Sequence, residues 1–341
     1  MTQPVVTALF LWQPRPELRA YLEHGLRDTG QVRLVFPPDT EPGTIRSLAA
    51  GADALVGWRP DEETLQAAKQ LRLFINPGAG VSHLLPRFAP RFRERGAVLV
   101  NGHGNSGFTA QHAVALLLAL ANQVVPHDRW LRQGRWRTGD AEVKSIPLRG
   151  RTLGLLGYGR VNRQVHLLLC GFELAFAVLR RDWSGRADPM PTPAARFGPD
   201  EIELFLSRVN TLVIALPETD GTRGLIKARE LELLGRDALL VNVGRGPVVD
   251  EEALYRALKE HTIAGAALDV WYDYRPEPDA ADRRYPYRFP FHELDNVVLS
   301  PHRAASPLDD LERWDEVIEN LRRLAAGRTD FLNVVDLERG Y

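Results

Sequence analysis

The stretch that most constrains this chain is residues 148–182, because it alone contains a complete strand, glycine-rich turn, helix and second strand. Residues 152–156 form a short apolar run without a polar face, which is typical of a strand buried on both sides in a parallel sheet. Gly157 and Gly159 follow directly. The first glycine permits a sharp turn, and the second lets a pyrophosphate approach the backbone amides of the next helix. The stretch therefore predicts a dinucleotide-binding unit.

The cofactor preference should be determined at the end of the second strand. An acidic residue there would bind the ribose of NAD, whereas arginines would bind the extra phosphate of NADP. Val178 takes the acidic position, and Arg180 and Arg181 follow it. We therefore predict NADP as the preferred cofactor, with NAD, served by Asp182, as the alternative. The glycine pattern is incomplete, since Asn162 replaces the third glycine of G-x-G-x-x-G.

Length and composition bound the rest of the interpretation. A chain of 341 residues is longer than one ordinary domain, which favours two. With 44% hydrophobic residues and a formal net charge of -1, the chain shows neither a disordered nor a nucleic-acid-binding composition. Its single cysteine cannot form an internal disulfide, and residues 5–12 read as a first strand rather than a signal peptide. We expect a cytoplasmic protein.

The first hundred residues alternate predicted strands and helices, as in a doubly wound parallel-sheet domain. The predicted strands are 5–11, 32–35, 54–56, 73–75 and 98–100, and the helices are 17–26, 45–50 and 62–70. Gly78, Ala79 and Gly80 come just after the fourth strand. Their backbone amides would lie at the carboxyl edge of the sheet, where such folds bind ligands. A simple tight turn is the alternative interpretation.

Two helices are predicted to cross between the domains. Residues 109–125 are almost wholly apolar, and Pro126 should end that helix. It is short for a membrane span and contains polar residues such as His112, so we predict a buried helix and no membrane partner. Residues 308–324 have apolar side chains at intervals of three and four, which is typical of a packed helix. Beyond the glycine-rich stretch, residues 188–199 read as a proline-rich loop.

The second informative stretch is residues 238–251. A strand over residues 239–243 would deliver Arg245, between two glycines, to the carboxyl edge of the sheet. There a guanidinium can form two parallel hydrogen bonds with a carboxylate. His302 follows a further predicted strand, residues 296–299, although a single histidine is more often structural.

Taken together, these segments resemble the D-isomer-specific 2-hydroxyacid dehydrogenases over nearly the whole chain. The resemblance is carried by NPGAGVSHL, GNSGFTAQHAVALLLAL, LRGRTLGLLGYGR, VIALPETDGTRGLI, LLVNVGRGPVVDEEAL, IAGAALDVW and LDNVVLSPH, in that order. It implies an α/β protein with two doubly wound parallel-sheet domains. A Rossmann-type NAD(P)-binding domain, residues 104–303, would be inserted in a flavodoxin-like substrate domain, residues 1–103 and 304–341.

The resemblance also implies an activity and roles for individual residues. The activity is hydride transfer between NADP or NAD and C2 of a small 2-oxo or 2-hydroxy acid, similar to glyoxylate or hydroxypyruvate. Arg245 would hold the substrate carboxylate, and His302 would be the acid-base residue. The cofactor-binding residues would be Gly157, Gly159, Arg160, Val161, Arg180, Arg181, Pro217, Val243 and Asp269. The substrate-binding residues would be Gly78, Ala79, Gly80 and Asn105, and no metal site is expected.

One departure from the family concerns the acidic partner of the histidine. The family's catalytic glutamate lies five residues after the aspartate of LDVW, and that position holds Tyr274. Glu277 is the predicted replacement if the loop carries a short insertion, with Asp273 and Glu293 as further candidates. A nearby carboxylate raises the pKa of a histidine by about 1 to 3 units. Without one, His302 would be largely neutral at pH 7.

Two alternatives to the reductase function remain open at this point. One is a dehydrogenase of a small anion such as formate or phosphite, and the other is a non-catalytic cofactor-binding sensor or corepressor of the same fold. For the assembly, residues 109–125 and 130–136 resemble the family's two-fold interface. We therefore predict a homodimer.

Overall fold

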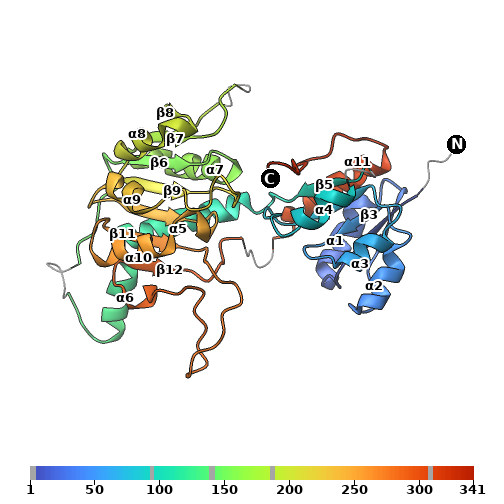
Figure 1. Cartoon of the computed structure of the whole chain (residues 1–341), viewed down its shortest axis with the longest axis horizontal. Helices are drawn as coiled ribbons and strands as arrows, with labels where there is room; N and C mark the ends of the chain where they lie inside the picture. The colour runs from blue at the N-terminus through green and yellow to red at the C-terminus, as the bar shows by residue number, and fades with distance from the viewer. Residues whose placement is uncertain (1–4, 93–95, 138–142, 185–188, 306–309) are drawn as a thin grey trace. The chain divides into compact units, whose positions relative to one another are not determined.

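The computed structural model describes residues 5–92, 96–137, 143–184, 189–305 and 310–341, which belong to two compact units. The first unit comprises Met1–Asn105 and Pro307–Tyr341, and the second comprises Ser106–Ser306. Each unit contains one parallel sheet with helices on both faces (Figure 1). The α/β class with two parallel-sheet domains is therefore confirmed. The expected domain boundaries lie within three residues of the division between the units.

The first unit has a five-stranded parallel sheet in the order β2-β1-β3-β4-β5. One face of this sheet packs against α1 and α11, and the other face packs against α2, α3 and α4. The strands are β1 (Val6–Phe10), β2 (Val32–Val35), β3 (Ala54–Val56), β4 (Leu73–Asn76) and β5 (Val98–Asn101); the helices are α1 (Pro16–Leu26), α2 (Pro42–Ala49), α3 (Glu62–Ala67), α4 (Leu85–Phe92) and α11 (Asp315–Ala325).

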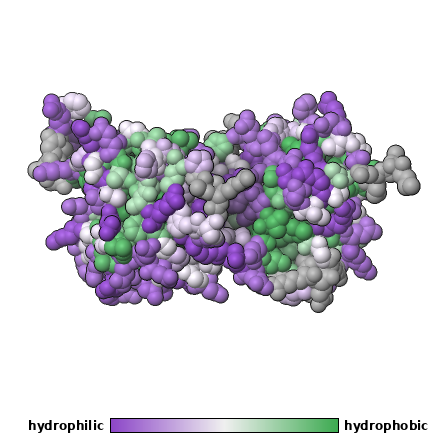
Figure 2. All heavy atoms as spheres, turned by 90° about the horizontal axis from the view of Figure 1, so that it is seen from above, coloured by the Kyte–Doolittle hydropathy of each residue, from purple (hydrophilic) through white to green (hydrophobic). Residues whose placement is uncertain are grey.

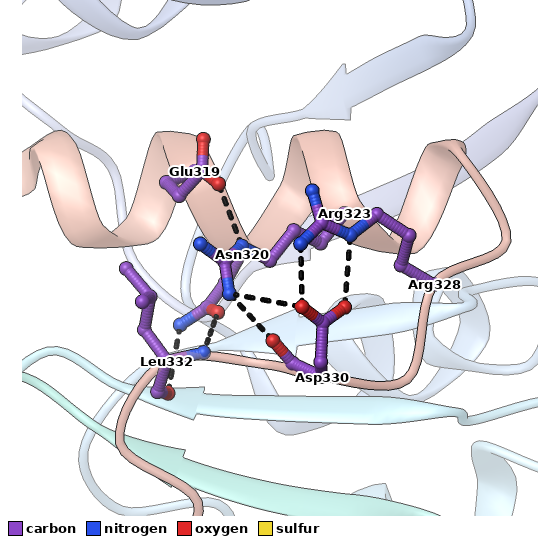
Figure 3. A network of polar contacts seen from close by, with 6 residues as sticks. All are labelled: Glu319, Asn320, Arg323, Arg328, Asp330 and Leu332. Carbon is purple, nitrogen blue, oxygen red and sulfur yellow. Dashed lines mark hydrogen bonds and ion pairs between the residues drawn. The ribbon is translucent and has the colours of Figure 1, made fainter.

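Helix α11 returns the chain to the first unit and is tied to the segment that follows it (Figure 3). Asn320, on the buried face of α11, exchanges two hydrogen bonds with the backbone of Leu332, which donates from its N–H at 2.7 Å. Arg323 binds Glu319 and the backbone carbonyl of Asp330. The expected helix over residues 308–324 begins later than predicted, since α11 starts at Asp315, and residues 306–309 lie outside the described part of the chain.

The second unit has a seven-stranded parallel sheet in the order β12-β11-β10-β9-β6-β7-β8. Helices α5 and α7 cover one face, and α8, α9 and α10 cover the other. The strands are β6 (Thr152–Leu156), β7 (Ala175–Leu179), β8 (Ala194–Phe197), β9 (Thr211–Ile214), β10 (Leu239–Asn242), β11 (Gly265–Leu268) and β12 (Val297–Leu299); the helices are α5 (Ser106–Ala121), α6 (Val124–Arg132), α7 (Arg160–Leu169), α8 (Ile202–Ser207), α9 (Ala228–Leu234) and α10 (Glu251–Lys259).

The prediction of one helix over residues 109–125 is wrong at its C-terminal end. Helix α5 ends at Ala121, and α6 begins at Val124 after a bend of 65°. The bend is centred on Gln123, whose φ of 55° is left-handed and cannot continue a right-handed helix. Pro126 lies in the first turn of α6, where the missing backbone N–H is not needed. Among the described residues, no single helix is long and apolar enough to cross a bilayer, and only α5 and α6 taken together reach that length and composition.

A second difference concerns the stretch expected to be a proline-rich loop, residues 188–199. Its described part contains β8, an edge strand that pairs with β7. Pro189, Pro191 and Pro193 precede the strand and Pro199 follows it, so the residues that pair keep their backbone N–H groups. Proline content alone therefore concealed a short edge strand.

The surface is mostly hydrophilic, with hydrophobic patches on both units in the view of Figure 2. In the second unit, large apolar side chains are exposed on α6 and just after it, at Val124, Leu131 and Trp136. None of the nine residues of α6 is buried. This helix therefore leaves apolar surface uncovered within its own chain.

Candidate active site

The glycine-rich turn after β6 leaves open the N-terminal end of α7. Gly157 has a φ of +81°, and a Cβ at this position would lie 2.6 Å from the side chain of Leu216, so only glycine fits. Gly159 is the N-cap of α7, and nothing lies within 4 Å of where its Cβ would be. An anion can therefore approach the backbone amides of Arg160 and Val161 in the first turn of the helix. This geometry fits a bound pyrophosphate.

Asn162 does more than replace the third glycine of the pattern. Its side chain is fully buried, and Nδ2 donates to the carbonyl oxygen of Gly157 at 2.6 Å. The same group lies 3.2 Å from the carbonyl of Leu156 and 3.3 Å from that of Val213. The side chain thus links α7 to the turn and to β6 and β9. Sequence reasoning treated this residue as a defect, but the structure shows an anchor.

The end of β7 presents cationic side chains around an indole. The guanidinium of Arg180 lies 5.1 Å from the ring of Trp183, and that of Arg196 on β8 lies 5.0 Å from it. Asp182 accepts hydrogen bonds from the N–H and the hydroxyl of Ser184, at 2.7 and 2.6 Å. These bonds, chiefly the one from the hydroxyl, lower the pKa of Asp182. Both bonds reach the same oxygen, Oδ1, so the end of β7 presents one carboxylate together with Arg180, Arg181 and Arg196.

Arg245 follows β10 between two glycines that are required by close contacts. A Cβ on Gly244 would lie 2.7 Å from backbone atoms of Leu216, and one on Gly246 would lie 2.3 Å from the carbonyl oxygen of Trp271. Arg245 itself has an extended backbone, and its Nη1 donates to the carbonyl of Gly244 at 2.7 Å. The arginine is therefore held at the carboxyl edge of the sheet, as predicted.

His302 lies in the loop after β12 and has a left-handed φ of 56°. Asp269, which follows β11 and is 1% exposed, holds this loop in place. Its carboxylate accepts from the hydroxyl of Ser300, from the N–H of Arg303 at 2.7 Å and from the N–H of Ala304 at 3.1 Å. A non-glycine residue in this conformation is strained, and such strain is common at functional sites.

The partner of His302 in the structure is a phenol. Tyr274 Oη lies 2.7 Å from His302 Nδ1, and the two rings meet edge to face at 5.2 Å. The backbone N–H of Trp271 also approaches this oxygen, at 3.3 Å. Within the described residues, no hydrogen bond or ion pair joins Glu277, the predicted acidic partner, to His302. The structure therefore brings Tyr274, rather than a carboxylate, to the imidazole.

The protein surroundings favour the uncharged form of both groups. Desolvation by the surrounding protein lowers the pKa of His302 below its usual value. The charge of Asp269 raises this pKa, and the charge of Arg245 lowers it further. Although Tyr274 is 52% exposed, partial desolvation by the surrounding protein raises its pKa above that of a free phenol, against the opposing effects of the Trp271 N–H and Arg245. Since Arg245 acts on both groups, these three residues form one cluster, which we call the Arg245–Tyr274–His302 cluster.

The remaining predicted cofactor residues lie at the same edge of the seven-stranded sheet. Pro217 follows β9, and its carbonyl accepts from the hydroxyl of Thr222 at 2.7 Å. Val243 follows β10 and is nearly buried. Asp269 was predicted to lie near the nicotinamide, and this contact stays a prediction. In the structure its carboxylate holds the loop that carries His302.

The predicted substrate-binding residues belong to the first unit, where Gly78, Ala79 and Gly80 follow β4. Two asparagines fix the carbonyls of this turn. Asn76 Nδ2 donates to those of Gly78 and Gly80, the latter at 3.2 Å, and Asn101 Nδ2 donates to that of Ala79 at 2.8 Å. Asn105 is the last residue before the second unit begins.

Sequence reasoning missed these asparagines, and a third one in the second unit. Asn242 donates to the carbonyl of Arg245 at 3.0 Å and accepts from the N–H of Gly244 at 3.1 Å. A signal for all three was available, because β4, β5 and β10 each end in asparagine, in the sequences LFIN, VLVN and LLVN. An amide side chain at a strand end can fasten the turn that follows.

Comparison with known proteins gives the family. The family profile described as "D-isomer specific 2-hydroxyacid dehydrogenase, NAD binding domain" matches residues 114–304. A glyoxylate reductase from Korarchaeum cryptofilum is 34% identical over 276 residues, which cover 79% of this chain and 78% of that protein. A D-3-phosphoglycerate dehydrogenase from Archaeoglobus fulgidus is 36% identical over 252 residues, covering 72% of this chain; the chain spans only 44% of the length of that relative.

A solved structure agrees over both units. The crystal structure of a D-isomer specific 2-hydroxyacid dehydrogenase from Xanthobacter autotrophicus in complex with NADPH and MES matches with a TM-score of 0.76 and 27% identity. The match covers 99% of this chain and 100% of that one. The chain therefore belongs to the D-isomer-specific 2-hydroxyacid dehydrogenase family, whose members are NAD(P)-dependent oxidoreductases acting on the CH–OH group.

Proposed function

We propose that this protein reduces a small 2-oxo acid, similar to glyoxylate or hydroxypyruvate, with NADPH as the preferred hydride donor. The observation that carries the proposal is the Arg245–Tyr274–His302 cluster, at the carboxyl edge of the sheet that also carries the glycine-rich turn. In such sheets ligands bind at this edge. The glyoxylate reductase relative supports this class of substrate.

Each side chain of the cluster has a task in this reaction. The reduced nicotinamide supplies a hydride to C2 of the acid. Arg245 binds the substrate carboxylate through its planar guanidinium and polarises the carbonyl oxygen. His302, when protonated, donates a proton from Nε2 to that oxygen as negative charge develops on it. Among the described residues, Nε2 has no hydrogen-bond partner, so it is available for this role.

The preference for NADP follows from the end of β7. Arg180 and Arg181 follow the strand directly, and Arg196 shares the indole of Trp183 with Arg180. Phosphate is a dianion that guanidinium groups bind well, and at the end of β7 three arginines accompany the single carboxylate, Asp182, that would bind the ribose of NAD. The NADPH complex of the Xanthobacter relative supports this choice.

The test is the loss of nicotinamide absorbance with purified protein, using NADPH and NADH in turn against glyoxylate, hydroxypyruvate, pyruvate and longer 2-oxo acids. We expect turnover with the shortest acids and a lower KM for NADPH than for NADH. If both cofactors bind but no 2-oxo acid is reduced, the result would contradict the proposal and favour a cofactor-binding sensor or corepressor.

A second candidate is oxidation of a small anion such as formate or phosphite, with Glu277 or another acid playing no part. The lowered pKa of His302 favours it, because removal of hydride from such an anion does not require an imidazolium as proton donor. Reduction of NADP by formate or phosphite, without reduction of any 2-oxo acid, would support this candidate over the first.

We further propose a homodimer in the cytoplasm, with no nucleic-acid or membrane partner. Exposed apolar side chains on α6 and at Trp136 support the dimer, since surface of this kind commonly marks an interface between proteins.

A further inference from the structure

The hydrogen bonds around Tyr274 favour one direction of its hydroxyl proton. The backbone N–H of Trp271 can only donate, so at 3.3 Å it occupies one lone pair of Tyr274 Oη. The other partner of the hydroxyl among the described residues is His302 Nδ1, at 2.7 Å. When the imidazole is neutral, Nδ1 is the acceptor within the described residues that this hydroxyl can donate to. The neutral ring then carries its own proton on Nε2.

Trp271 is a firm support for this arrangement. Its side chain is 3% exposed, and its indole N–H donates to the carbonyl of Ser300 at 2.8 Å. Its own carbonyl packs so closely against Gly246 that no Cβ fits there. Trp271 thus places the hydroxyl of Tyr274 relative to the loops after both β10 and β12.

We infer that Tyr274 is the positioning residue of His302 and that its uncharged hydroxyl takes the place of a carboxylate partner, favouring the neutral tautomer with the proton on Nε2. The inference rests on the proposed reductase function for its catalytic meaning, but the tautomer is a property of the protein alone. It makes Tyr274, rather than Glu277, the residue that determines the acid-base behaviour of this site.

A phenol and a carboxylate have opposite effects on the neutral ring. An ionised carboxylate can only accept, so it holds the proton on Nδ1 in both states of the histidine and leaves Nε2 bare when the ring is neutral. A phenol can donate to neutral Nδ1 and can accept from Nδ1–H once the ring is protonated. With Tyr274, Nε2 therefore carries a proton in both states and always donates toward a substrate oxygen.

This difference favours one direction of chemistry. A bare Nε2 is the general base that oxidation of a hydroxy acid requires, and the Tyr274 hydroxyl disfavours that tautomer. A protonated Nε2 is the donor that orients the carbonyl of a 2-oxo acid, although only the imidazolium can release its proton easily. Reduction should therefore follow the protonated fraction of His302 and be fastest in acid.

Other charged groups also lie around the Tyr274–His302 pair. Asp269 approaches from the end of β11, but Ser300 and two backbone N–H groups occupy its oxygens. Arg245 approaches from the end of β10 and opposes protonation. His112 of α5 lies 2.9 Å from the hydroxyl of Ser300 and 3.4 Å from the carboxylate of Asp269. Glu218, after β9, acts on Tyr274 and is paired with Arg223.

The direct test is ¹⁵N-edited NMR of the histidine side chains in the full chain, with His302 assigned from the signal that disappears in His302→Asn. In the unmodified protein we expect the neutral Nε2–H tautomer and a pKa below that of a free histidine. In Tyr274→Glu we expect the Nδ1–H tautomer and a pKa raised by about 1 to 3 units. An Nδ1–H tautomer in the unmodified protein, or a pKa unchanged in Tyr274→Glu, would overturn the inference.

Kinetics give a second readout. The pH profile of kcat/KM for 2-oxo acid reduction should fall above an apparent pKa below 6.5 and extend to higher pH in Tyr274→Glu. Tyr274→Phe should lower kcat by about 2- to 12-fold, the value of one lost hydrogen bond, without extending the profile. Full activity in Tyr274→Phe would count against the positioning role.

The matched control is Tyr287→Phe. The hydroxyl of Tyr287 makes the same kind of bond in the same loop, with Nδ1 of His292 at 3.1 Å. The Tyr287→Phe substitution should therefore leave the His302 signal and the pH profile unchanged. The two proposals fail in different ways. Absence of turnover with the expected tautomer would contradict the proposed function alone, and turnover with the opposite tautomer would contradict the role of Tyr274 alone.

Discussion

At the scale of single residues, His302 combines a chemical role with an unusual backbone. Its left-handed φ of 56° is uncommon for a residue with a Cβ, and asparagine tolerates this conformation best after glycine. The loop that carries it is held by the buried carboxylate of Asp269 rather than by His302 itself. The side chain can therefore be changed without loss of the loop.

We predict that His302→Asn folds normally and lowers kcat for 2-oxo acid reduction by about 100- to 10,000-fold, the usual contribution of a general acid. Steady-state kinetics would measure the loss, and NADPH affinity and melting temperature would serve as controls that should not change. A rate within about tenfold of the unmodified enzyme would exclude His302 as the proton donor.

The residues that sequence reasoning missed share a physical cause. Tyr274 was recognised as standing in the position of an acid, but linear distance cannot reveal a hydrogen bond between residues 28 positions apart. Asn162 was read only as a missing glycine because its bonds to Gly157 and Val213 depend on how α7 packs on the sheet. The position of Arg245 at the carboxyl edge of the sheet was predictable, because the sequence Gly-Arg-Gly directly follows an apolar strand.

At the scale of elements, the buried histidine of α7 couples stability to pH. His166 is fully buried, with Nδ1 bonded to the hydroxyl of Tyr158 at 2.8 Å and Nε2 bonded to that of Thr192 at 2.8 Å. Its ring stacks on Phe176 at 4.0 Å. Burial lowers the pKa of His166 from 6.5 to about 4. The folded protein therefore binds fewer protons than the unfolded chain between these two values.

The sign of the effect follows from that difference. Stability from the neutral His166 is fully present above about pH 6.5 and is lost as the pH falls toward 4, by roughly 2 to 4 kcal/mol in all. We predict that denaturant unfolding at pH 7 and pH 5 shows a smaller drop in the free energy of unfolding for His166→Gln than for the unmodified protein. His127→Gln, on the exposed α6, is the control. An equal drop in all three proteins would show that His166 titrates normally.

A buried asparagine on helix α11 fastens the segment that follows the helix. Asn320 is 1% exposed and meets both the N–H and the C=O of Leu332 (Figure 3). Asn320→Ala would leave those backbone groups without their partner, which costs about 1 to 3 kcal/mol for each buried donor or acceptor. We expect a loss of about 2 kcal/mol in the free energy of unfolding.

Arg328→Ala provides the contrast for this measurement. Arg328 pairs with Asp330 on the surface of the same segment, and exposed ion pairs contribute at most about 1 kcal/mol. A loss in Arg328→Ala as large as that in Asn320→Ala would contradict the assignment of the anchor to the asparagine.

The elements themselves were predictable to different degrees. Predicted strands 32–35, 54–56 and 152–156 coincide with β2, β3 and β6. β3 and β6 are apolar runs inside their parallel sheets, and β2, an edge strand, keeps three apolar residues beside Arg33. The break between α5 and α6 and the edge strand β8 were not foreseen. Both depend on single backbone conformations or on pairing with a distant strand, which composition does not encode.

At the scale of the whole molecule, alternation of strands and helices was enough to predict two doubly wound units. The predicted return of the chain to the first unit was also visible, from the apolar spacing of a helix now seen as α11. Assembly is a different matter. The surface that would form a dimer is apolar in the sequence, but so is the core, and only the structure separates the two.

That separation supports the last prediction, a homodimer formed through α6. Helix α5 is largely buried in its own unit, whereas Leu131 of α6 is 58% exposed and Trp136, just beyond it, is 71% exposed. Side chains of this size lose apolar contact with water when a second copy covers them. Sedimentation equilibrium should give the mass of two chains, and Leu131→Asp should give one. Leu204→Asp, at an apolar residue of α8 that is 44% exposed, should remain a dimer. A single-chain mass for the unmodified protein would show that α6 does not mediate self-association.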